Sequence, residues 1–410
     1  MRFAATGRFA LAMRNIFRHR TRTLATLAAI GLGVASLIVA GGFVQDSFIQ
    51  LGEATIHSQT GHIQLTQEGF RESRRRASDL HLISQPERIK SLLAGEPGIE
   101  QVVSRINFSG MLNNGKRDLG IIGDGIEPDG EAKIGSFLRY IEGRALTDND
   151  LDGMVVGEGV ARTLDLQVGD RVTLVASVAQ GALNTQDFLL VGVFQSFSRE
   201  FDARSVRIPL SATRQLLDTE GAHVVVISLE HTHDTLRAVN AVRERMSGQQ
   251  LQVMSWMELS DFYEKAVELY AAQFGVLRLI ILAMVLLSVA NSINMTLFER
   301  TREFGTLQAL GDRPARVFQL IILESTLLGL LGATVGMALG VVLAWIISAI
   351  GIPMPPPPNS NIGYTAVIRL NLDDVLSAGS VGLIATCLAA IIPARRASRW
   401  PVVDALRQGA

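Results

Sequence analysis

The chain has 410 residues, of which 48% are hydrophobic and 19% charged, and its mean hydropathy is +0.28. Charge this low and hydropathy this high are atypical of a soluble protein and predict membrane-spanning segments. The formal net charge of −1 gives no general argument for nucleic-acid binding. The single cysteine, Cys387, excludes an intrachain disulfide and a metal site built from several cysteines.

Residues 1–23 predict a basic amphipathic helix, because Phe9, Met13 and Ile16 recur at helical spacing among arginines. Such a helix suits the cytoplasmic surface of a membrane, as an elbow before the first span. The alternative is the basic start of a cleaved signal peptide. Leu24–Val44 is longer than a usual signal core, however, and no small-residue cleavage site follows it.

Four stretches are long and apolar enough to cross a bilayer, which takes about 20 residues. They are assigned to residues 24–45, 271–297, 317–350 and 374–393. The first span contains small residues that favour close helix packing, within the chain or against a second protomer. These residues are Gly31, Gly33, Gly41 and Gly42. A membrane helix that merely tolerates glycine is the alternative.

The third span contains one acid, Glu324, and a stripe of glycines on one helix face. The stripe consists of Gly329, Gly332, Gly336 and Gly340. An ionisable group inside a span indicates a function such as proton coupling by default. A packing or hydrogen-bonding role with a neighbouring helix is the alternative for Glu324.

Arginines flank the spans unevenly. They cluster before the first span, between the second and third, and after the fourth, whereas residues 351–373 carry only Arg369. The positive-inside rule therefore places both termini, including the tail at residues 394–410, in the cytoplasm with residues 298–316. Residues 46–270 and 351–373 are then outside, and the second of these segments contains a proline-rich run that cannot be helical.

Residues 46–270 predict a large α+β domain inserted between the first two helices of a four-helix membrane protein. The strand candidates are His62–Thr66, Val102–Phe108, Leu119–Gly123, Arg171–Ala176, Phe188–Phe194, His223–Leu229 and Leu251–Ser255. The helix candidates are Pro86–Ala94, Gly159–Leu164, Ala212–Leu217 and Asp234–Met246. Met257–Ala272 predicts a continuous helix into the second span. Arg71–Arg76 reads as a solvated linker, with anionic lipid contact as the alternative.

Two patterns resemble chemistry that the sequence does not support. Gly110–Arg117 nearly matches a P-loop, but Arg117 stands where a Ser or Thr would hold magnesium, and Asn113-Asn114-Gly115 predicts a hairpin turn instead. The pairs His57/His62 and His231/His233 lack further zinc ligands and are predicted to be surface histidines. We therefore expect no catalytic, metal or nucleotide site in this chain, so a partner chain must supply any ATPase.

The segment Glu299–Gly311 reads ERTREFGTLQALG and lies between the second and third spans. Four of its first five residues are charged, and Leu307 and Leu310 fit a short amphipathic helix. A helix of this kind at a membrane surface is suited to docking in a groove of a partner protein.

This segment resembles the coupling helix of FtsX-like, MacB/LolC/LolE-type ABC transporter permeases. Ala12–Thr26 (AMRNIFRHRTRTLAT) resembles the opening of that family, and Gly157–Val175 resembles a strand–helix–strand stretch of its periplasmic domain. Pro393–Arg407 (PARRASRWPVVDALR) resembles the family's closing P-x-x-R-A-x-x-x-x-P-x-x-A-L-R. The similarity extends from about Leu11 to Gln408.

The resemblance implies a multi-pass permease subunit of a bacterial inner membrane, with a MacB-like periplasmic domain. It implies a dimer of permeases, either two copies or a copy and a paralogue, and a separate ABC ATPase dimer. The permease itself would not be an enzyme, because ATP and magnesium would bind the partner ATPase. By mechanotransmission, ATP-driven closure of that ATPase would move the periplasmic domain and extrude a lipoprotein or lipid.

The resemblance also assigns ATPase coupling to particular residues of the segment. They are Glu299, Arg300, Arg302, Glu303, Gly305, Leu310 and Gly311. The charged residues would contact the ATPase, Gly305 would permit close approach, and Gly311 would end the helix. The alternative is that the arginines only fix the membrane topology.

Two departures from the family affect the functional prediction. MacB carries a fused ATPase domain before its first span, whereas here Met1 begins almost at the elbow helix, which favours systems with separate subunits such as the lipoprotein-releasing complex. Ser177–Gln186 is too short for the hook with which LolC recruits a periplasmic carrier. Efflux of a small molecule or peptide with a periplasmic adaptor, and FtsX-like regulation of a periplasmic hydrolase, are the alternative functions.

Overall fold

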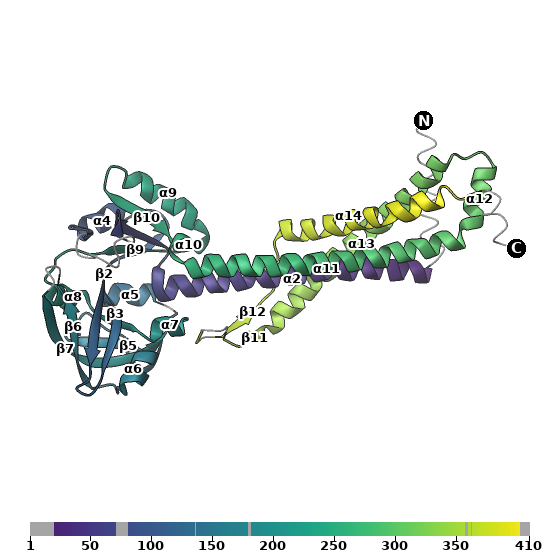
Figure 1. Ribbon diagram of the computed structural model, residues 1–410. Helices are drawn as coiled ribbons and strands as arrows, with labels where there is room; N and C mark the ends of the chain where they lie inside the picture. The colour runs from purple at the N-terminus through teal and green to yellow at the C-terminus, as the bar shows by residue number, and fades with distance from the viewer. Residues whose placement is uncertain are drawn as a thin grey trace. The chain divides into compact units, whose positions relative to one another are not determined.

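The computed structural model describes residues 20–70, 81–135, 137–178, 182–356, 360–361 and 363–401. The chain divides into two compact units (Figure 1). The helical unit consists of Met1–Phe48, Ala266–Pro353 and Thr365–Ala410, and the globular unit consists of Ile49–Lys265 and Met354–Tyr364. Most of the predicted elbow helix, the Arg71–Arg76 linker and the tail after residue 401 lie outside the described residues.

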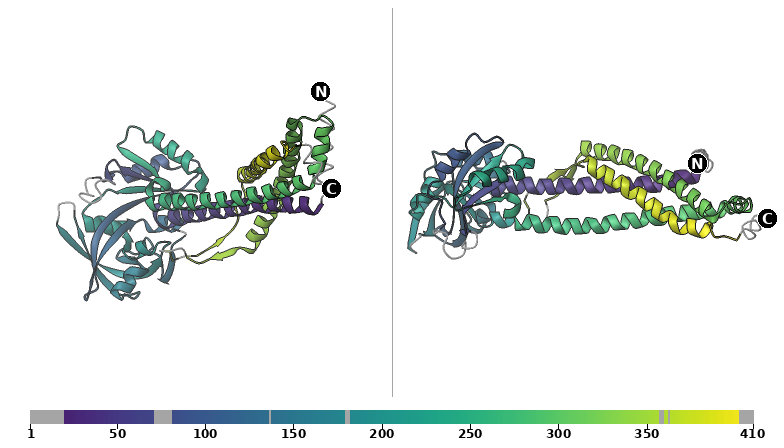
Figure 2. Two further views of the ribbon diagram at one scale, coloured as in Figure 1. Left: turned by 45° about the vertical axis from the view of Figure 1, so that its right-hand side comes forward. Right: turned by 90° about the horizontal axis from the view of Figure 1, so that it is seen from above.

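The elements of the helical unit are long helices joined by short connections. They are α2 (Arg20–Thr55), α11 (Asp261–Glu299), α12 (Thr301–Ala309), α13 (Pro314–Ile350) and α14 (Leu372–Ala397). Within the described residues, four of these helices are long and apolar enough to cross a membrane: α2, α11, α13 and α14. The predicted spans lie within these four helices, and Figure 2 shows α13 and α14 side by side.

The helices α2 and α11 are longer than a membrane crossing requires. They contain 36 and 39 residues, against the about 20 that cross a bilayer. The prediction of one helix over Met257–Ala272 is wrong at its start. A short helix α10 (Trp256–Leu259) is capped by the side chain of Ser255 and ends at Ser260, so that α11 begins only at Asp261.

The glycine stripe of α13 forms the contact with neighbouring helices of the helical unit. Gly332, Gly336 and Gly340 face α2, and Gly329 faces α14. A methyl group at Gly336 would lie 2.8 Å from the carbonyl oxygen of Gly31. The two backbones therefore approach closely, and only small residues at this crossing permit it.

We expect Gly336→Ala to destabilise the protein by about 1–3 kcal/mol, because the added methyl group has no space beside the backbone of α2. Gly275→Ala is the matched control, since a methyl group at this glycine of α11 would have no atom within 4 Å. Thermal unfolding of both variants in detergent measures the difference. Equal stability of the two variants would contradict the close crossing.

The globular unit is built around a mixed sheet with the strand order β10-β1-β9-β2-β3-β8-β5-β7-β4, in which β6 also pairs with β2 and β7 (Figure 1). The strands are β1 (Ile63–Gln67), β2 (Ile99–Asn113), β3 (Asp118–Ile126), β4 (Arg139–Gly143), β5 (Gly153–Gly157), β6 (Arg171–Ser177), β7 (Leu183–Gln195), β8 (Ser205–Pro209), β9 (Val224–Leu229) and β10 (Leu251–Ser255). Most neighbours are antiparallel, whereas β3 with β8 and β5 with β7 are parallel.

Short helices cover this sheet. They are α4 (Pro86–Leu93), α5 (Pro128–Ile134), α6 (Glu158–Leu164), α7 (Arg199–Asp202), α8 (Leu210–Leu217) and α9 (Thr235–Arg245), with a π-helical turn η1 (Ile56–Thr60) and a 3-10 turn η3 (Thr232–Asp234). Two main apolar cores result. One includes Phe188 and Leu174 with residues of α6 and α8, and the other includes Leu65 and Val225 with residues of α4 and α9.

Each predicted strand and helix of the globular unit overlaps an element of the predicted type. The prediction missed β4, β5 and β8, which are five residues long each. β5 is buried along its whole length and its sequence GMVVG carries no polar–apolar alternation, whereas β8 reads SVRIP, which alternates but is short and ends in a proline. The proline-rich connection begins in an extended strand, β11 (Ile352–Met354), which pairs with β12 (Tyr364–Ala366).

Candidate functional site

The candidate coupling segment forms α12, a separate short helix between α11 and α13 (Figure 1). Thr301, Phe304 and Gly305 are its buried residues, and Phe304 belongs to the apolar core of the helical unit. The side-chain amide of Gln308 donates from Nε2 to the backbone carbonyl oxygen of Ser398 at 3.2 Å, and Ser398 follows the end of α14. One face of α12 is therefore fixed against the helices around it.

A buried ionic cluster joins the start of α12 to α13. Arg300 donates from Nη1 to Glu324 Oε2 at 2.8 Å and from Nε to Glu303 Oε2 at 2.8 Å. Its guanidinium carbon lies 5.0 Å from the ring centre of Phe304. The side chains of Arg300 and Glu324 are 8% and 12% exposed. Since these charges are largely removed from water, they are stable only as a pair.

Gly311 terminates the coupling segment. Its φ of +102° is a conformation that favours glycine. The amide of Gly311 donates to the carbonyl of Gln308 at 3.0 Å, and that of Asp312 donates to the carbonyl of Leu307 at 3.0 Å. These bonds close the last turn of α12, and Pro314 then begins α13.

The structure separates the seven sequence-predicted coupling residues into two groups. Glu299, Arg302, Leu310 and Gly311 are exposed, and the Leu310 side chain is 81% exposed. Arg300 and Gly305 are buried, and Glu303 is half-buried beside Arg300. The exposed group can contact a partner chain directly, whereas Arg300 contacts the chain's own acids.

The sequence analysis missed the pairing of Arg300 with Glu324. It left open whether Glu324 couples protons or bonds to a neighbouring helix, and the structure shows a bond to Arg300. The two residues are 24 positions apart, and only the reversal of the chain at α12 brings them together. The sequence did contain a signal for this pairing, namely a short connection between two spans with a single acid inside the second span.

The predicted packing glycines of α2 lie against other parts of the helical unit. A methyl group at Gly33 would strike the side chain of Val285 in α11, and one at Gly42 would lie 2.4 Å from the carbonyl oxygen of Arg369. Gly31 faces Gly336, and Gly41 faces the guanidinium of Arg278. These positions therefore serve contacts inside the chain, and an interface with a second protomer through them stays a prediction.

In the globular unit, a clasp of two buried arginines holds the end of the helix formed by α2 and η1. Arg207 donates from Nη2 to the carbonyl oxygen of Ser58 at 3.0 Å, and Arg105 donates from Nη1 to that of Gln59. Arg105 also forms a two-bond ion pair with buried Glu131 of α5. The last carbonyls of a helix lack partners within it, so these side chains fix the helix end to the sheet.

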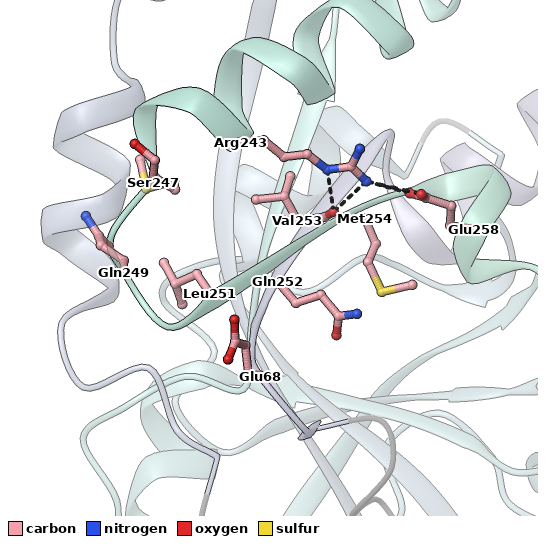
Figure 3. A pocket seen from close by; sticks show the side chains of 10 residues that line it. Glu68, Arg243, Ser247, Gln249, Leu251, Gln252, Val253, Met254 and Glu258 are labelled. Carbon is pink, nitrogen blue, oxygen red and sulfur yellow. Dashed lines mark hydrogen bonds and ion pairs between the residues drawn. The ribbon is translucent and has the colours of Figure 1, made fainter.

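A hollow of about 360 Å³ lies beside the edge strand β10 (Figure 3). Arg243 donates from Nη2 to the carbonyl oxygen of Val253 at 3.0 Å and to Glu258 Oε1 at 3.1 Å. Glu258 Oε2 accepts from the amide of Ser255 at 2.7 Å. These two side chains occupy backbone groups that an added strand would use, so we interpret them as protection of the sheet edge.

The Gly110–Arg117 segment is the hairpin turn that the sequence favoured over a P-loop. β2 and β3 pair as antiparallel strands up to Asn113 and Asp118, and Gly115 has a φ of +82°. The side chain of Asn114 accepts from the amides of Lys116 and Arg117 at 3.0 and 2.8 Å. A P-loop requires a helix after the glycine-rich loop, and here a strand follows.

The prediction of a surface position is wrong for His62, which is 1% exposed. Its Nδ1 accepts from the amide of Leu229 at 3.1 Å, and its Nε2 lies 3.0 Å from Thr232 Oγ1. The ring is therefore neutral. Burial, followed by the charge of nearby His57, lowers the pKa of His62 to about 4. The alternation of β1 did not indicate this burial, because adjacent strand residues point to opposite faces and His62 directly precedes buried Ile63.

The buried His62 predicts a loss of stability in mild acid. The unfolded chain takes up this proton near pH 6.5, whereas the folded chain does so only near pH 4. The free energy of unfolding therefore falls by about 3 kcal/mol as the pH decreases from 6.5 to 4. Chemical unfolding of wild type and His62→Gln across this pH range measures the contribution of His62 to the free energy of unfolding. His233→Gln is the control, because His233 is exposed. A wild type whose pH dependence equals that of His62→Gln would contradict it.

Two family models cover most of the chain. The MacB-like periplasmic core domain matches residues 23–245, and the FtsX-like permease C-terminal domain matches residues 275–402. Among solved structures, the periplasmic region of MacB from Actinobacillus actinomycetemcomitans is similar at 16% identity and a TM-score of 0.36. That match covers 52% of this chain and 94% of the other.

Full-length relatives agree with these models. The lipoprotein-releasing system transmembrane protein LolC of Neisseria meningitidis is 24% identical over 409 residues, which cover 94% of each chain. The uncharacterized ABC transporter permease YknZ of Bacillus subtilis is 24% identical and covers 97% of this chain and 98% of its own. The macrolide export ATP-binding/permease protein MacB of Campylobacter jejuni is 23% identical and covers 97% of this chain and 61% of its own.

The matched segments coincide with the structural features already described. The first family model covers α2 from residue 23 and the sheet of the globular unit as far as α9. The second covers α11 from residue 275, then α12, α13 and α14. In the part of the chain that the structure describes, four apolar helices and an α+β domain between the first two lie in or beside these matched segments. The chain therefore belongs to the FtsX-like ABC transporter permeases that carry a MacB-like periplasmic core domain.

Proposed function

We propose that this permease couples ATP hydrolysis by a separate ATPase subunit to motion of its periplasmic domain, and thereby releases a lipoprotein or lipid from the inner membrane. The observation that carries the proposal is the two-sided construction of α12. Its inner face is fixed by Phe304 and by the bond between Arg300 and Glu324. Its outer face presents Arg302 and Leu310 to a partner.

The proposal places α12 and both termini in the cytoplasm. Arginines lie at this end of the spans, in α12, at the start of α13 and at the end of α14. Short loops rich in Lys and Arg remain on the cytoplasmic side of a membrane. An ATP-binding partner would therefore reach α12, whereas the globular unit would lie in the periplasm.

The transmitting element in this proposal is the pair of long helices α2 and α11, which continue beyond the length of a membrane crossing. The clasp of Arg105 and Arg207 supports this role for α2, because it fixes the helix end to the sheet. A displacement of this helix end would then move the sheet with it.

The similarity to LolC over the full length of both chains supports lipoprotein or lipid as the cargo. Recruitment of a soluble carrier by this chain is not part of the proposal. β6 ends at Ser177 and β7 begins at Leu183, and these two residues pair in the register of the hairpin. The connection is short, and this observation favours a second candidate function, export through a periplasmic adaptor, which the similarity to MacB also supports.

The test is purification of the tagged full-length chain in mild detergent, with its bound proteins and lipids identified by mass spectrometry. We expect an ABC ATPase subunit together with a lipoprotein or phospholipid. Arg302→Glu should remove the ATPase and leave thermal stability unchanged, because this side chain is exposed. Arg237→Glu in the globular unit, where the side chain is 87% exposed, should retain it.

The possible results separate the functions. An adaptor-like protein without bound lipid would favour the export function, and a hydrolase without lipid would favour regulation. Failure to recover any ATPase subunit with the wild-type chain would refute the proposal.

A further inference from the structure

His57 lies at the end of the helix formed by α2 and η1, and its ring bonds on both sides. Its Nε2 lies 3.2 Å from a carboxylate oxygen of Glu53 in α2, and its Nδ1 lies 3.0 Å from the carbonyl oxygen of Ile134, the last residue of α5. The ring also stacks on Phe137, with 5.7 Å between the ring centres. This side chain therefore ties the helix end to the end of α5.

The two partners determine the charge of the His57 ring. A carboxylate and a carbonyl oxygen accept hydrogen bonds and cannot donate them, so both ring nitrogens must carry a proton. A ring with both protons is an imidazolium cation. The bond to Glu53 holds the pKa of His57 above its ordinary value, and burial opposes this effect in part. The folded chain therefore stabilises the cationic form.

The neighbouring polar groups fit a cationic His57. His62, whose ring centre lies 5.6 Å from that of His57, is neutral because its Nδ1 accepts from a backbone amide. Its Nε2 therefore donates to the hydroxyl group of Thr232, which in turn donates to Glu53. A further carboxylate that acts on His57 is Glu100 of β2. Of the two groups that donate to Glu53, only His57 gains or loses a proton near neutral pH.

Loss of one proton from His57 breaks this arrangement. A neutral ring has one N–H group, so it donates to Glu53 or to Ile134 and not to both. The other nitrogen then directs a lone pair at an acceptor, and the two repel. The arginine clasp on Ser58 and Gln59 does not change, because arginine stays protonated. The contact between the helix end and α5 is therefore the one that responds to pH.

The position of His57 permits such a response. The residue belongs to η1, a π-helical turn, and such turns are rare and frequent at functional sites. It follows the end of the predicted span, residue 45, by 12 residues (57 − 45), which corresponds to about 18 Å of helix. The His57 side chain is 18% exposed, so its proton exchanges with water.

We propose that His57 is a pH-responsive joint of the globular unit: its protonated ring ties the end of the helix formed by α2 and η1 to α5, and loss of the proton releases α5 from that helix end. The joint is fully closed below pH 6.5, the ordinary value for histidine, and opens as the pH rises through the higher value of the folded chain. The inference rests on the proposed function in one respect, because that function places the globular unit outside the cytoplasm. The pH of that compartment would then set how firmly α2 holds the sheet.

The fluorescence of Trp256 tests the proposal in the full chain. Trp256 packs on α2 at Gly52, where an added methyl group would lie 2.7 Å from the indole ring. Trp345→Phe and Trp400→Phe remove the other two tryptophans and give the parent variant. In detergent, its emission should change between about pH 6 and about pH 9, with a midpoint above about 6.5. His57→Gln should abolish this transition, because glutamine does not titrate.

Glu53→Gln distinguishes the joint from a merely structural contact. This change keeps the size of the side chain and removes its charge, so the midpoint of the transition should move down by about one pH unit. A structural contact would change the size of the transition and leave its midpoint in place. His233→Gln is the control, because His233 is exposed, and it should leave both unchanged.

Thermal unfolding gives a readout that does not depend on Trp256. Near pH 6 the wild type should unfold about 2–4 °C above His57→Gln, and this difference should disappear near pH 9. A fluorescence transition that persists in His57→Gln, or a midpoint that Glu53→Gln does not move, would overturn the inference. So would a parent without any transition above pH 6.5 whose thermal difference from His57→Gln is the same at both pH values. No ATPase is present in these measurements, so such a failure is distinct from a failure of the proposed coupling.

Discussion

Glu324→Leu will destabilise the helical unit by about 3–5 kcal/mol, because it leaves Arg300 buried without its partner in α13. The double variant Arg300→Met with Glu324→Leu should recover most of this loss, since an apolar pair of similar volume avoids the cost of burying charge. Unfolding in detergent measures the stability of both variants. The control is Arg316→Met, which removes a solvent-exposed pair with Asp312 in the same region and should change stability by less than about 1 kcal/mol.

The double variant also separates two roles of Arg300. If Arg300 only fixes the orientation of α12, the stable double variant will still copurify with the ATPase. A double variant that is stable but binds no ATPase would show that Arg300 itself contacts the partner, as the family resemblance implies. A single variant as stable as wild type would contradict the importance of the buried pair.

Arg105→Met should destabilise the globular unit by about 3–5 kcal/mol, because Glu131, which is 4% exposed, would lose its counter-ion. Burial opposes ionisation of Glu131, but the charge and hydrogen bonds of Arg105 hold its pKa below the ordinary value. Without Arg105 the pKa of Glu131 will rise. Denaturant unfolding of the full chain measures the loss.

The control for this clasp is Arg162→Met, which removes an exposed pair with Glu158 and should have little effect. Arg105→Met with Glu131→Leu tests the anchoring role separately. This double variant should regain stability, yet hydrogen exchange in residues 56–60 should be faster, because the carbonyl of Gln59 would lose its donor. Unchanged exchange in these residues would exclude Arg105 as the anchor of the helix end.

The sequence was most informative where one physical rule dominates. The length of an apolar run determines whether a helix can cross a bilayer, so the spans could be located without any contact information. Alternation and turn residues identified β1, β2, β3, β6, β7 and β10, and a run of β-branched residues identified β9, which is buried along its whole length. The same rule missed β5, because a strand buried on both faces need carry no alternation.

The sequence likewise predicted some features of the candidate site and not others. The charged segment after the second span was visible in the sequence, and so was the glycine that ends α12. Whether Arg300 or Arg302 faces a partner was not visible, because residues two positions apart on a helix point about 200° apart and only the surrounding helices define the inside. The outcome was opposite for the two: Arg300 is buried and Arg302 is exposed.

By itself the sequence determined the four spans, the domain between the first two, the short helix before the third and the family. These features depend on composition and local order along the chain. The tertiary structure decided which charges are paired, because Arg300 meets Glu324, and Arg105 meets Glu131, only after the chain folds back on itself. It also decided that the glycines of α2 serve contacts within the chain. Burial and pairing are properties of the space around a side chain, and no local pattern in the sequence contains them.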